Sequence, residues 1–420
     1  MSELALPSSL RAWLLGGLLV SFYPLLGLKR AFSLIGIGLA LYGIFLLFRR
    51  GRVLFENPAI RAGLMVAAGF ALPLLFALTD AAFPEVSAAA TASSLLYLPI
   101  LIAVIVLVQE QQVTRPMLLL SVMVTAFWVL DGVVQLACGY DIFGMAYNSH
   151  RIGAYWQNQM KFGYYMGFFG LFAVAAQAVC WPHRRFILIG FWLIIALGVL
   201  ISGNREAWLM FFPASAVLFW VHVARFSQYR WLVLVSGLIL ACLLVVGAYE
   251  LSFTVRDRIA QSLNGLHWSY AALDEASSHR LDLWRVAVEL IAEHPINGLG
   301  MDAYQVLLPE LARDPLWHGK ADAPYPHQYL FEIGAASGVI GWFGLIMIFF
   351  VVKRAWFQAS NEQRAMAWPA LIYLMALWFP LNTHRSFYSS ELIMGNLLMM
   401  GIILGNLLPV RKSTQVAGKY

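Results

Sequence analysis

Residues 328–352 read QYLFEIGAASGVIGWFGLIMIFFVV, a run of 25 residues in which Glu332 is the only charged side chain. A helix needs about 20 predominantly apolar residues to cross the hydrocarbon core of a bilayer, so this run predicts a transmembrane helix. Eleven further apolar runs make twelve in all, at about 10–28, 31–48, 62–79, 89–108, 116–137, 160–180, 186–201, 207–224, 231–250, 366–381 and 387–408. The sequence therefore predicts an all-α polytopic membrane protein with about 12 transmembrane helices.

The composition supports the same class. Of the 420 residues, 61% are hydrophobic and only 12% are charged, whereas a soluble domain carries about 25% charged residues. Too few charges remain to cover a water-soluble globule of this size. The three cysteines form no CxxC pair, which excludes a disulfide framework or a zinc site of the usual spacing. The net charge of +6 indicates attraction to anionic headgroups and a bias across the membrane, with no nucleic-acid partner.

The connections between the runs alternate in charge. With Arg11 included, 16 Lys and Arg residues fall on one side and about six on the other. Because cytoplasmic loops carry the excess of positive charge, we expect both termini in the cytoplasm. The segment Met1–Leu28 lacks a small-residue cleavage site and is followed at once by another apolar run, so we expect no cleavable signal there.

One connection is much longer than the rest and faces outside in this topology. The expected organisation is helices 1–9 in residues 1–250, a loop domain in 251–327, and helices 10–12 with a cytoplasmic tail in 328–420. A loop of this length in a compact protein is usually functional. Inside it, Ser277 and Ser278 can cap a helix that begins near His279. The apolar stripe of that helix consists of Leu281, Trp284, Val288 and Ile291, and we expect it to lie on the bundle or in the membrane interface.

The first outer-side constellation is residues 202–208, Ser-Gly-Asn-Arg-Glu-Ala-Trp. Ser202 or Asn204 can cap the following helix, whose free N–H groups attract anions. Arg205 adds a permanent charge with a fork that matches phosphate. In the structural alternative, Arg205 and Glu206 form a surface pair that merely ends a hairpin.

The second constellation follows in the long loop. Arg280 and Trp284 share one face at a spacing of four residues, and Arg285 can pair with Glu289 at the same spacing. Arg280 is the stronger functional candidate because Arg285 has a local carboxylate. An ordinary solvated amphipathic helix explains the pattern equally well.

The third constellation surrounds His327, which follows two prolines and begins the tenth run. Histidine is the side chain best suited to take up a proton near neutral pH. Glu332 lies about one turn further in, where a carboxylate needs a partner or a function. The small residues Gly334, Gly338 and Gly341 form a face that allows close helix approach. The alternative is an interfacial histidine that only binds the loop.

A fourth segment, residues 151–161, mixes cations, amides and aromatic rings, and the segment 382–385 resembles it. The mixture suits sugar or phosphate recognition and equally suits an aromatic belt. The sequence contains no GxxxxGK[ST], GxGxxG, HExxH or DxD motif, which argues against a nucleotide-driven pump, a zinc protease and a metal–diphosphate glycosyltransferase.

These motifs together resemble the bacterial O-antigen ligase and polymerase superfamily of polytopic inner-membrane proteins. Its arginine, tryptophan, glycine and histidine signatures are similar to Arg151-Ile-Gly-Ala with Gln157-Asn158, Ser202-Gly-Asn-Arg205-Glu-Ala207, Arg280-x-x-x-Trp284, Pro295-x-x-Gly298-x-Gly300, and His327 with ten residues before Gly338. Gln328-Tyr329 departs from the Asn/Ser-x that often follows this histidine. The resemblance implies a GT-C-like fold with one large helical periplasmic loop between helices 9 and 10.

The resemblance also implies an activity. The donor would be an undecaprenyl-diphosphate-linked glycan and the acceptor a sugar hydroxyl of lipid A–core, with membrane lipids around both and no metal or other cofactor. His327 would be the base, and Arg205 and Arg280 would stabilise the diphosphate. The substrate-binding candidates are Arg151, Gln157, Asn158, Trp284, Arg285, Tyr329 and Arg385.

Other functions stay open. An O-antigen polymerase would extend the same donor, and a protein O-oligosaccharyltransferase would use a serine or threonine acceptor. A lipid or solute transporter would place its functional residues at the membrane midplane, where Asp131 and Glu332 are the only strong candidates. A transferase would gather them at the outer face.

Overall fold

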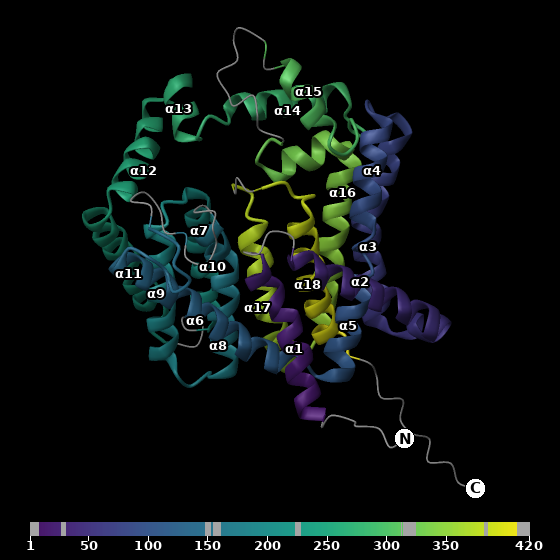
Figure 1. The fold of residues 1–420 in the computed structure, drawn as a ribbon, viewed down its shortest axis with the longest axis horizontal. Helices are drawn as coiled ribbons and strands as arrows, with labels where there is room; N and C mark the ends of the chain where they lie inside the picture. Colours follow the sequence, from purple (N-terminus) through teal and green to yellow (C-terminus); the bar gives the residue numbers. More distant parts are fainter. Residues whose placement is uncertain are drawn as a thin grey trace.

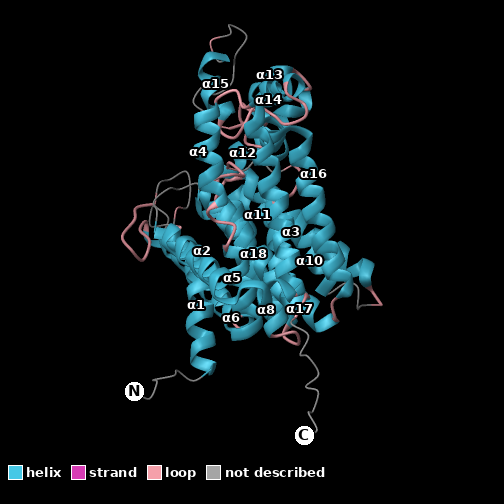
Figure 2. Cartoon of the chain, turned by 90° about the vertical axis from the view of Figure 1, so that its right-hand side faces the viewer, coloured by secondary structure: helices cyan, strands magenta, loops and turns pink. Residues whose placement is uncertain are grey.

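The chain is almost entirely helical. The computed structural model describes residues 8–26, 31–147, 153, 161–222, 228–311, 313, 325–381 and 385–409. Its bundle consists of α1 (Ser8–Leu25), α2 (Ala31–Arg50), α3 (Pro58–Ala77), α4 (Pro84–Leu95), α5 (Ile100–Gln111), α6 (Thr114–Cys138), α7 (Lys161–Tyr165), α8 (Leu171–Cys180), α9 (Arg185–Ile201), α10 (Arg205–His222), α11 (Arg230–Leu251), α16 (Tyr329–Gln358), α17 (Asn361–Leu377) and α18 (Ser390–Leu407). Figure 2 shows how these helices pack lengthwise.

The predicted membrane fold is confirmed. Each of the twelve apolar runs coincides with one helix or with consecutive helices. Among the described residues, eight stretches are long and apolar enough to cross a membrane, and two shorter apolar helices, Ser9–Leu25 and Phe186–Ile201, accompany them. One run contains α4 and α5, and another contains α7, a π-helical turn at Met166–Gly170, and α8. The protein is therefore an all-α, multi-pass membrane protein.

The long connection before α16 is itself helical. It contains α12 (Phe253–Asn264), α13 (Tyr270–Ala276), α14 (Leu281–Glu293) and α15 (Ala303–Leu311). Figure 1 shows these helices across one end of the bundle, which we call the loop end. The beginning of α1 and the end of α18 lie at the opposite end, which we call the terminal end.

The buried face of α14 differs from the predicted stripe. Leu283, Val286, Ala287 and Leu290 are buried, whereas Val288 is 50% exposed. These buried residues pack on Leu299, Ala303, Tyr304 and Leu308, so α14 and α15 share a small core of their own. The buried residues lie about one position before those predicted. The reason is that α14 packs on two neighbours, α15 and α16. Its Trp284 instead packs on Phe331 of α16, with ring centroids 6.1 Å apart.

The predicted small-residue face of α16 is confirmed in part: a Cβ added to Gly334 would lie 2.7 Å from the side chain of Ile291 on α14, and a second close approach lies outside that face. A Cβ added to Gly344 would lie 2.3 Å from the carbonyl oxygen of Gly69 on α3, so these two glycines allow the two helices to touch. Gly338 is instead non-helical, with φ +58° and ψ −152°, and it breaks α16. The predicted glycine face at 334–341 therefore does not include Gly338, because the backbone leaves the helical conformation there.

The break in α16 is filled by residues 295–300 of the long loop, and we call this contact the loop joint. The N–H groups of Leu299 and Gly300 donate to the carbonyls of Ala335 and Ala336 at 2.9 and 3.1 Å. In return, the N–H groups of residues 339 and 340 donate to the carbonyls of residues 295 and 296 at 2.9 and 3.2 Å. The backbone groups freed by the break are thus satisfied by the loop.

Glycine is required on both sides of the loop joint. A Cβ on Gly298 would lie 2.4 Å from the amide nitrogen of Ser337, and a Cβ on Gly338 would lie 2.4 Å from the carbonyl oxygen of Ile296. Two motifs that are far apart in sequence, Pro-x-x-Gly-x-Gly and the glycine eleven residues after His327, are therefore two halves of one contact.

Candidate functional site

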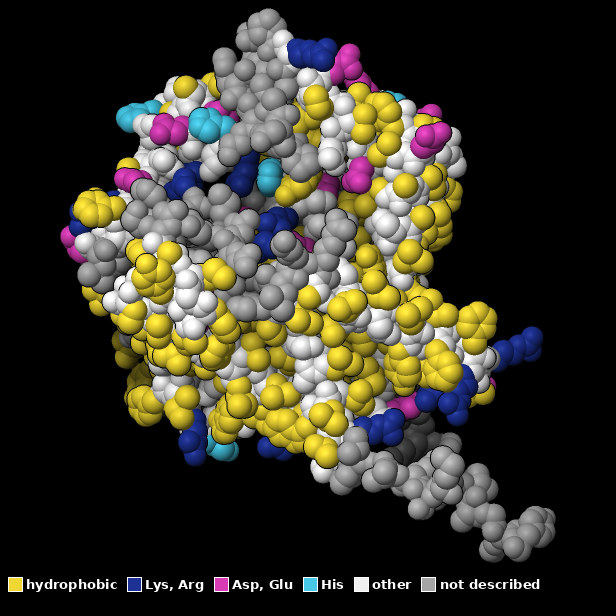
Figure 3. Space-filling view, viewed as in Figure 1, with side chains coloured by type: hydrophobic (Ala, Val, Ile, Leu, Met, Phe, Trp, Pro, Cys, Tyr) yellow, Lys and Arg dark blue, Asp and Glu magenta, His cyan; other side chains and the backbone are white. Residues whose placement is uncertain are grey.

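A cavity of about 400 Å³ lies at the loop end, between the bundle and the helices of the long loop. Figure 3 shows Lys, Arg and His side chains gathered in a hollow there. Six segments contribute its lining, which consists of Lys161, Tyr164, Gly203, Asn204, Arg205, Glu206, Arg258, Ser278, His279, Arg280, Leu283, Tyr325, His327 and Arg385. The cavity therefore brings together residues of all four predicted constellations, the fourth represented by Lys161.

Arg205 is placed by the turn between α9 and α10. Gly203 has φ +63°, and a Cβ there would lie 2.4 Å from Thr254, so the turn needs glycine. The side-chain oxygen of Asn204 accepts a hydrogen bond from the N–H of Glu206 at 3.1 Å, which confirms the predicted cap of α10. Arg205 itself donates to Ser278 in the long loop, and to Ser262 on α12 at 3.3 Å. The bundle and the loop thus meet through this guanidinium.

Arg280 follows a tight turn between α13 and α14. Asp274 holds this turn, because its carboxylate accepts hydrogen bonds from the ring of His279 at 2.8 Å and from the N–H of Leu281 at 3.2 Å. The helix begins at Leu281, two residues later than predicted, and Ser277 accepts a hydrogen bond from the N–H of Arg280 at 3.3 Å. The predicted serine cap is therefore wrong: Arg280 is the N-cap residue of α14, and a carboxylate of the preceding helix, Asp274, accepts the first helical N–H instead.

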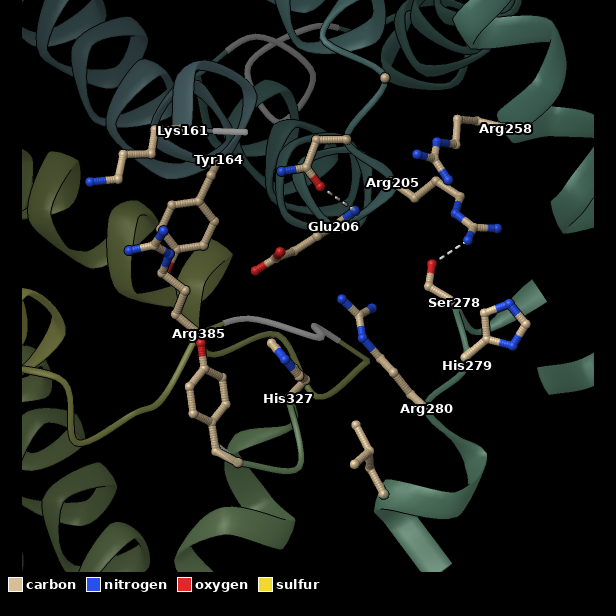
Figure 4. Close-up of a pocket in the computed structure, with 14 residues that line it drawn as sticks. Lys161, Tyr164, Arg205, Glu206, Arg258, Ser278, His279, Arg280, His327 and Arg385 are labelled. Atoms are coloured by element: carbon tan, nitrogen blue, oxygen red, sulfur yellow. Dashed lines mark hydrogen bonds between the residues drawn. The ribbon is translucent and has the colours of Figure 1, made fainter. Parts of the chain in front are cut away.

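His327 stands in the short approach to α16. The indole N–H of Trp284 donates to the carbonyl of Pro326 at 3.0 Å. The side chain of Gln328 accepts from the N–H of Phe331 at 2.8 Å and so caps α16. The ring of Tyr325 lies 4.4 Å from that of His327. His327 is thus held from both sides, and Figure 4 shows its ring facing the cavity.

Backbone strain is concentrated around this cavity. Six non-glycine residues of the described chain have positive φ, and three of them, Ser278, His279 and His327, line the cavity, at φ +64°, +60° and +55°. Such conformations cost about 1–3 kcal/mol each and persist where the surroundings enforce them. Their clustering marks this cavity as a site where side-chain placement matters.

Glu206 was misinterpreted from the sequence, where it was weighed only as a surface partner of Arg205. Its carboxylate points into the cavity (Figure 4). The Oε1 atom is shielded from solvent and has no hydrogen-bond partner among the described residues. Burial raises the pKa of Glu206 to about 8, although Arg280 and Arg385 both act to lower it. Leaving a buried carboxylate oxygen unpaired costs free energy, so Glu206 is a candidate for substrate contact. Its position directly after Arg205 was the only sequence signal.

The arginines of the cavity differ in their surroundings. Burial lowers the pKa of Arg280, whereas Glu206 and Tyr325 act in the opposite direction. Burial alone would lower the pKa of Arg385, but the attraction of Glu391 and its hydrogen bond at 2.7 Å raise it. The positive charge of Arg280 is thus less compensated by its surroundings than that of Arg385. Arg280 faces the centre of the cavity in Figure 4.

The charge of the lining is strongly unbalanced. Five of its residues are cations and one is a carboxylate, Glu206; the cations are Lys161, Arg205, Arg258, Arg280 and Arg385. An arrangement of this kind, beside the N-terminus of α10, favours a ligand with more than one negative charge. Sequence reasoning did not assign Lys161, Tyr164, Arg258 or Tyr325 to one site, because the fold and not local spacing brings them together.

Other predicted site residues lie beside the cavity and not in its lining. Trp284 supports the approach to His327. The hydroxyl of Tyr329 donates to the carbonyl of Trp378 at 2.8 Å. Arg285 pairs with Asp282 at 3.6 Å, so its predicted pairing with Glu289 is wrong; the carboxylate three residues earlier takes its place. Three further candidates lie outside the described residues, namely Arg151, Gln157 and Asn158.

The two membrane carboxylates have structural partners. Glu332 accepts hydrogen bonds from Ser386 and from the N–H of Phe387, the latter at 2.8 Å, and so anchors the segment that carries Arg385. Asp131 accepts from the N–H of Ile142 at 2.9 Å. Within the described part of the chain, no group of three or more His, Cys, Asp or Glu side chains is arranged to hold a metal ion.

Comparison with known proteins gives one result that bears on this site. Residues 189–346 match a family model described as O-Antigen ligase. The matched segment contains Arg205, Arg280 and His327 together with both halves of the loop joint. No curated protein matches the sequence.

Proposed function

We propose that this chain, a multi-pass membrane protein of the O-antigen ligase superfamily, transfers a polysaccharide from undecaprenyl diphosphate to a sugar hydroxyl of lipid A–core. The observation that carries the proposal is the cavity at the loop end, where Arg205, Arg280 and His327 meet although they come from three distant segments. A site for a diphosphate leaving group needs cations beside a base, and this cavity supplies both.

The reaction assigns a step to each group. The hydroxyl oxygen of the acceptor forms a bond to the anomeric carbon as the bond from that carbon to the diphosphate breaks, and the electron pair stays on the diphosphate. Attack from the face opposite the leaving group inverts the anomeric centre. His327 takes the proton of the hydroxyl, a contribution of roughly 10²–10⁴-fold.

The arginines act on the charge that grows on the diphosphate. Arg280 is half-buried and follows the turn that Asp274 holds, and Arg205 is fixed between α12 and the α13–α14 turn, so both are oriented before the substrate arrives. A preorganised fork of this kind stabilises the developing charge without reorganisation. We therefore expect the reaction to proceed without a metal ion.

Orientation follows from the same proposal. The loop end would face the periplasm of a bacterial inner membrane, with both termini in the cytoplasm. The bias of basic residues supports this, because the arginines of the terminal end include Arg11, Arg49 and Arg50.

Two related activities share this chemistry. An O-antigen polymerase would transfer to the end of a second lipid-linked glycan, and a protein O-oligosaccharyltransferase to a serine or threonine. We favour the ligase because the sequence has one large outer loop, whereas two arginine-rich loops are typical of polymerases. A transporter is less well supported, because the cations gather at the loop end and Asp131 already binds Ile142.

The test is a reconstituted reaction. Purified protein is incubated in EDTA with an undecaprenyl-diphosphate glycan and lipid A–core, with His327→Ala beside the wild type. We expect glycan on lipid A–core with the wild type only. The matched control is His183→Ala, an exposed histidine in the turn between α8 and α9, which should retain activity.

Each other outcome points elsewhere. Longer lipid-linked glycan without core transfer would identify a polymerase. Transfer to a protein substrate would identify the protein glycosyltransferase. Full activity of a folded His327→Ala protein would reject this residue as the base.

A further inference from the structure

A second basic cavity lies at the terminal end, far from the candidate active site. It has a volume of about 470 Å³ and lies between α1, α2 and α5. Its polar lining includes Arg11, Arg49, Arg50 and Glu110, beside the rings of Tyr42 and Phe45. Figure 3 shows Lys and Arg side chains along this edge of the molecule.

The charges of this cavity do not cancel. Arg50 binds Glu110 through both of its terminal nitrogens, one of them at 2.8 Å. The guanidinium of Arg49 lies 5.7 Å from the ring centroid of Phe45. Within the described chain, neither Arg49 nor Arg11 forms an ion pair with a carboxylate. Two positive charges therefore remain where α1 begins and α2 ends.

An apolar groove continues from the same cavity. Its volume is about 350 Å³, and it shares Arg11 and Tyr42 with the basic cavity. The groove runs between α1 and α2 over Leu15, Leu18, Leu34, Ile35, Gly38 and Leu39. Leu18 and Leu34 are 41% and 71% exposed, and a Cβ on Gly38 would have no neighbour within 4 Å. The groove is therefore open and lined mainly by apolar side chains, as the binding of a hydrocarbon chain requires.

We propose that α1, α2 and α5 form a binding site for an anionic phospholipid. Its phosphate would lie between Arg11 and Arg49, and one acyl chain would occupy the groove beside Gly38. Charge complementarity favours an anionic over a zwitterionic lipid, because a choline group would add a third positive charge beside two unpaired arginines. The apolar groove favours a lipid over a soluble phosphate, which could not cover Leu18 and Leu34.

The experiment measures lipid retention on the intact protein. The full-length protein in a neutral detergent is titrated with phosphatidylglycerol or phosphatidylcholine, and bound lipid is counted by native mass spectrometry. We expect phosphatidylglycerol to bind more tightly. The double variant Arg11→Gln/Arg49→Gln should lose about 25-fold in affinity, since one cation near a lipid headgroup contributes about fivefold.

Two further variants make the test specific. Gly38→Leu keeps every charge but fills the groove, so it should also weaken phosphatidylglycerol binding. Arg115→Gln/Arg184→Gln removes two arginines at other connections on the same side and should bind lipid as the wild type does. Melting temperatures without added lipid establish that each variant is folded.

The proposal fails on any of three results. Equal binding of the two lipids would remove the charge argument. Unchanged binding by the folded Arg11→Gln/Arg49→Gln protein would remove the site. Competition by inorganic phosphate at constant ionic strength, with no effect of Gly38→Leu, would show a soluble-anion site instead. None of these measurements depends on glycan transfer.

Discussion

Arg280 is the residue whose placement depends most on its neighbours, since Asp274, His279 and Ser277 all hold the turn that carries it. We predict that Arg280→Lys lowers kcat/KM for glycan transfer by about 10²–10³-fold, the usual effect of losing one preorganised donor. Lysine keeps the charge but lacks the planar fork. Steady-state kinetics test this, with Arg313→Lys as control because Arg313 is an exposed arginine of the same loop. A lysine variant with wild-type kinetics would show that charge alone suffices.

Substitution of Arg280 should impair the enzyme, whereas substitution of Glu206 should strengthen its binding of the donor. Among the described lining residues, Glu206 is the only carboxylate, and it lies near Arg280 and Arg385. Because burial raises the pKa of Glu206 to about 8, Glu206→Gln removes a negative charge only above that pH; the Kd of the donor should fall by about fivefold near pH 9, from roughly 1 kcal/mol of lost repulsion, and change little near pH 6.

The rate of transfer should nevertheless decrease in Glu206→Gln if the carboxylate binds an acceptor hydroxyl. Donor binding is measured by calorimetry at two salt concentrations, and transfer is measured separately. Weaker donor binding in this variant would contradict the repulsion argument and would indicate that Glu206 contacts the donor directly.

At the scale of elements, the loop joint yields the sharpest stability prediction. Gly338→Ala places a Cβ 2.4 Å from the carbonyl oxygen of Ile296 at a residue with φ +58°. We expect a loss of roughly 1–3 kcal/mol and a matching fall in transfer activity, because the strain acts on the element that carries His327. The control is Gly237→Ala, where a Cβ meets nothing within 4 Å and alanine should be neutral or favourable.

Comparing the loss of stability with the loss of transfer activity distinguishes a local effect on the site from simple misfolding. Thermal unfolding and glycan transfer are measured on the same preparation. A Gly338→Ala protein with unchanged stability and activity would show that the break in α16 is not needed.

The elements themselves were largely predictable from the sequence. Eight of the twelve apolar runs coincide with stretches long and apolar enough to cross a membrane, and two more coincide with shorter apolar helices, because length and hydropathy decide whether a segment can span a bilayer. The break at Gly338 was not predictable, since it depends on hydrogen bonds with residues 295–300. The register of α14 was wrong for the same reason: a helix with two neighbours buries more than one stripe.

The candidate site was predictable by residue type and not by arrangement. Arg205, Arg280 and His327 were each identified from local motifs, and the fold brings them to one cavity. Glu206 and Arg258 could not be assigned from spacing, because their relation to the cavity arises only when α10 meets α12 and the turn between α13 and α14. Arg285 was mispaired because two carboxylates lie within one turn of it.

At the scale of the whole molecule, the proposal that the loop end and the terminal end face opposite sides of the membrane can be tested. We predict that Arg313→Cys, in the long loop, reacts with a membrane-impermeant thiol reagent on intact spheroplasts. Arg184→Cys, in the turn between α8 and α9, should react only after permeabilisation. Both changes are made after replacing the native Cys138, Cys180 and Cys242. Labelling of Arg184→Cys in intact spheroplasts would reverse the proposed orientation.

The loop joint also imposes an order of assembly during synthesis. Residues 295–300 leave the ribosome before residues 335–340, to which they bind. Translation at about 5–20 residues per second makes this wait a few seconds long. Throughout that interval the segment carrying Arg280 has no anchor on α16, and His327 has not been placed. The cavity is therefore completed late in translation, and a nascent chain can hold no finished site before the helix after the loop has entered the membrane.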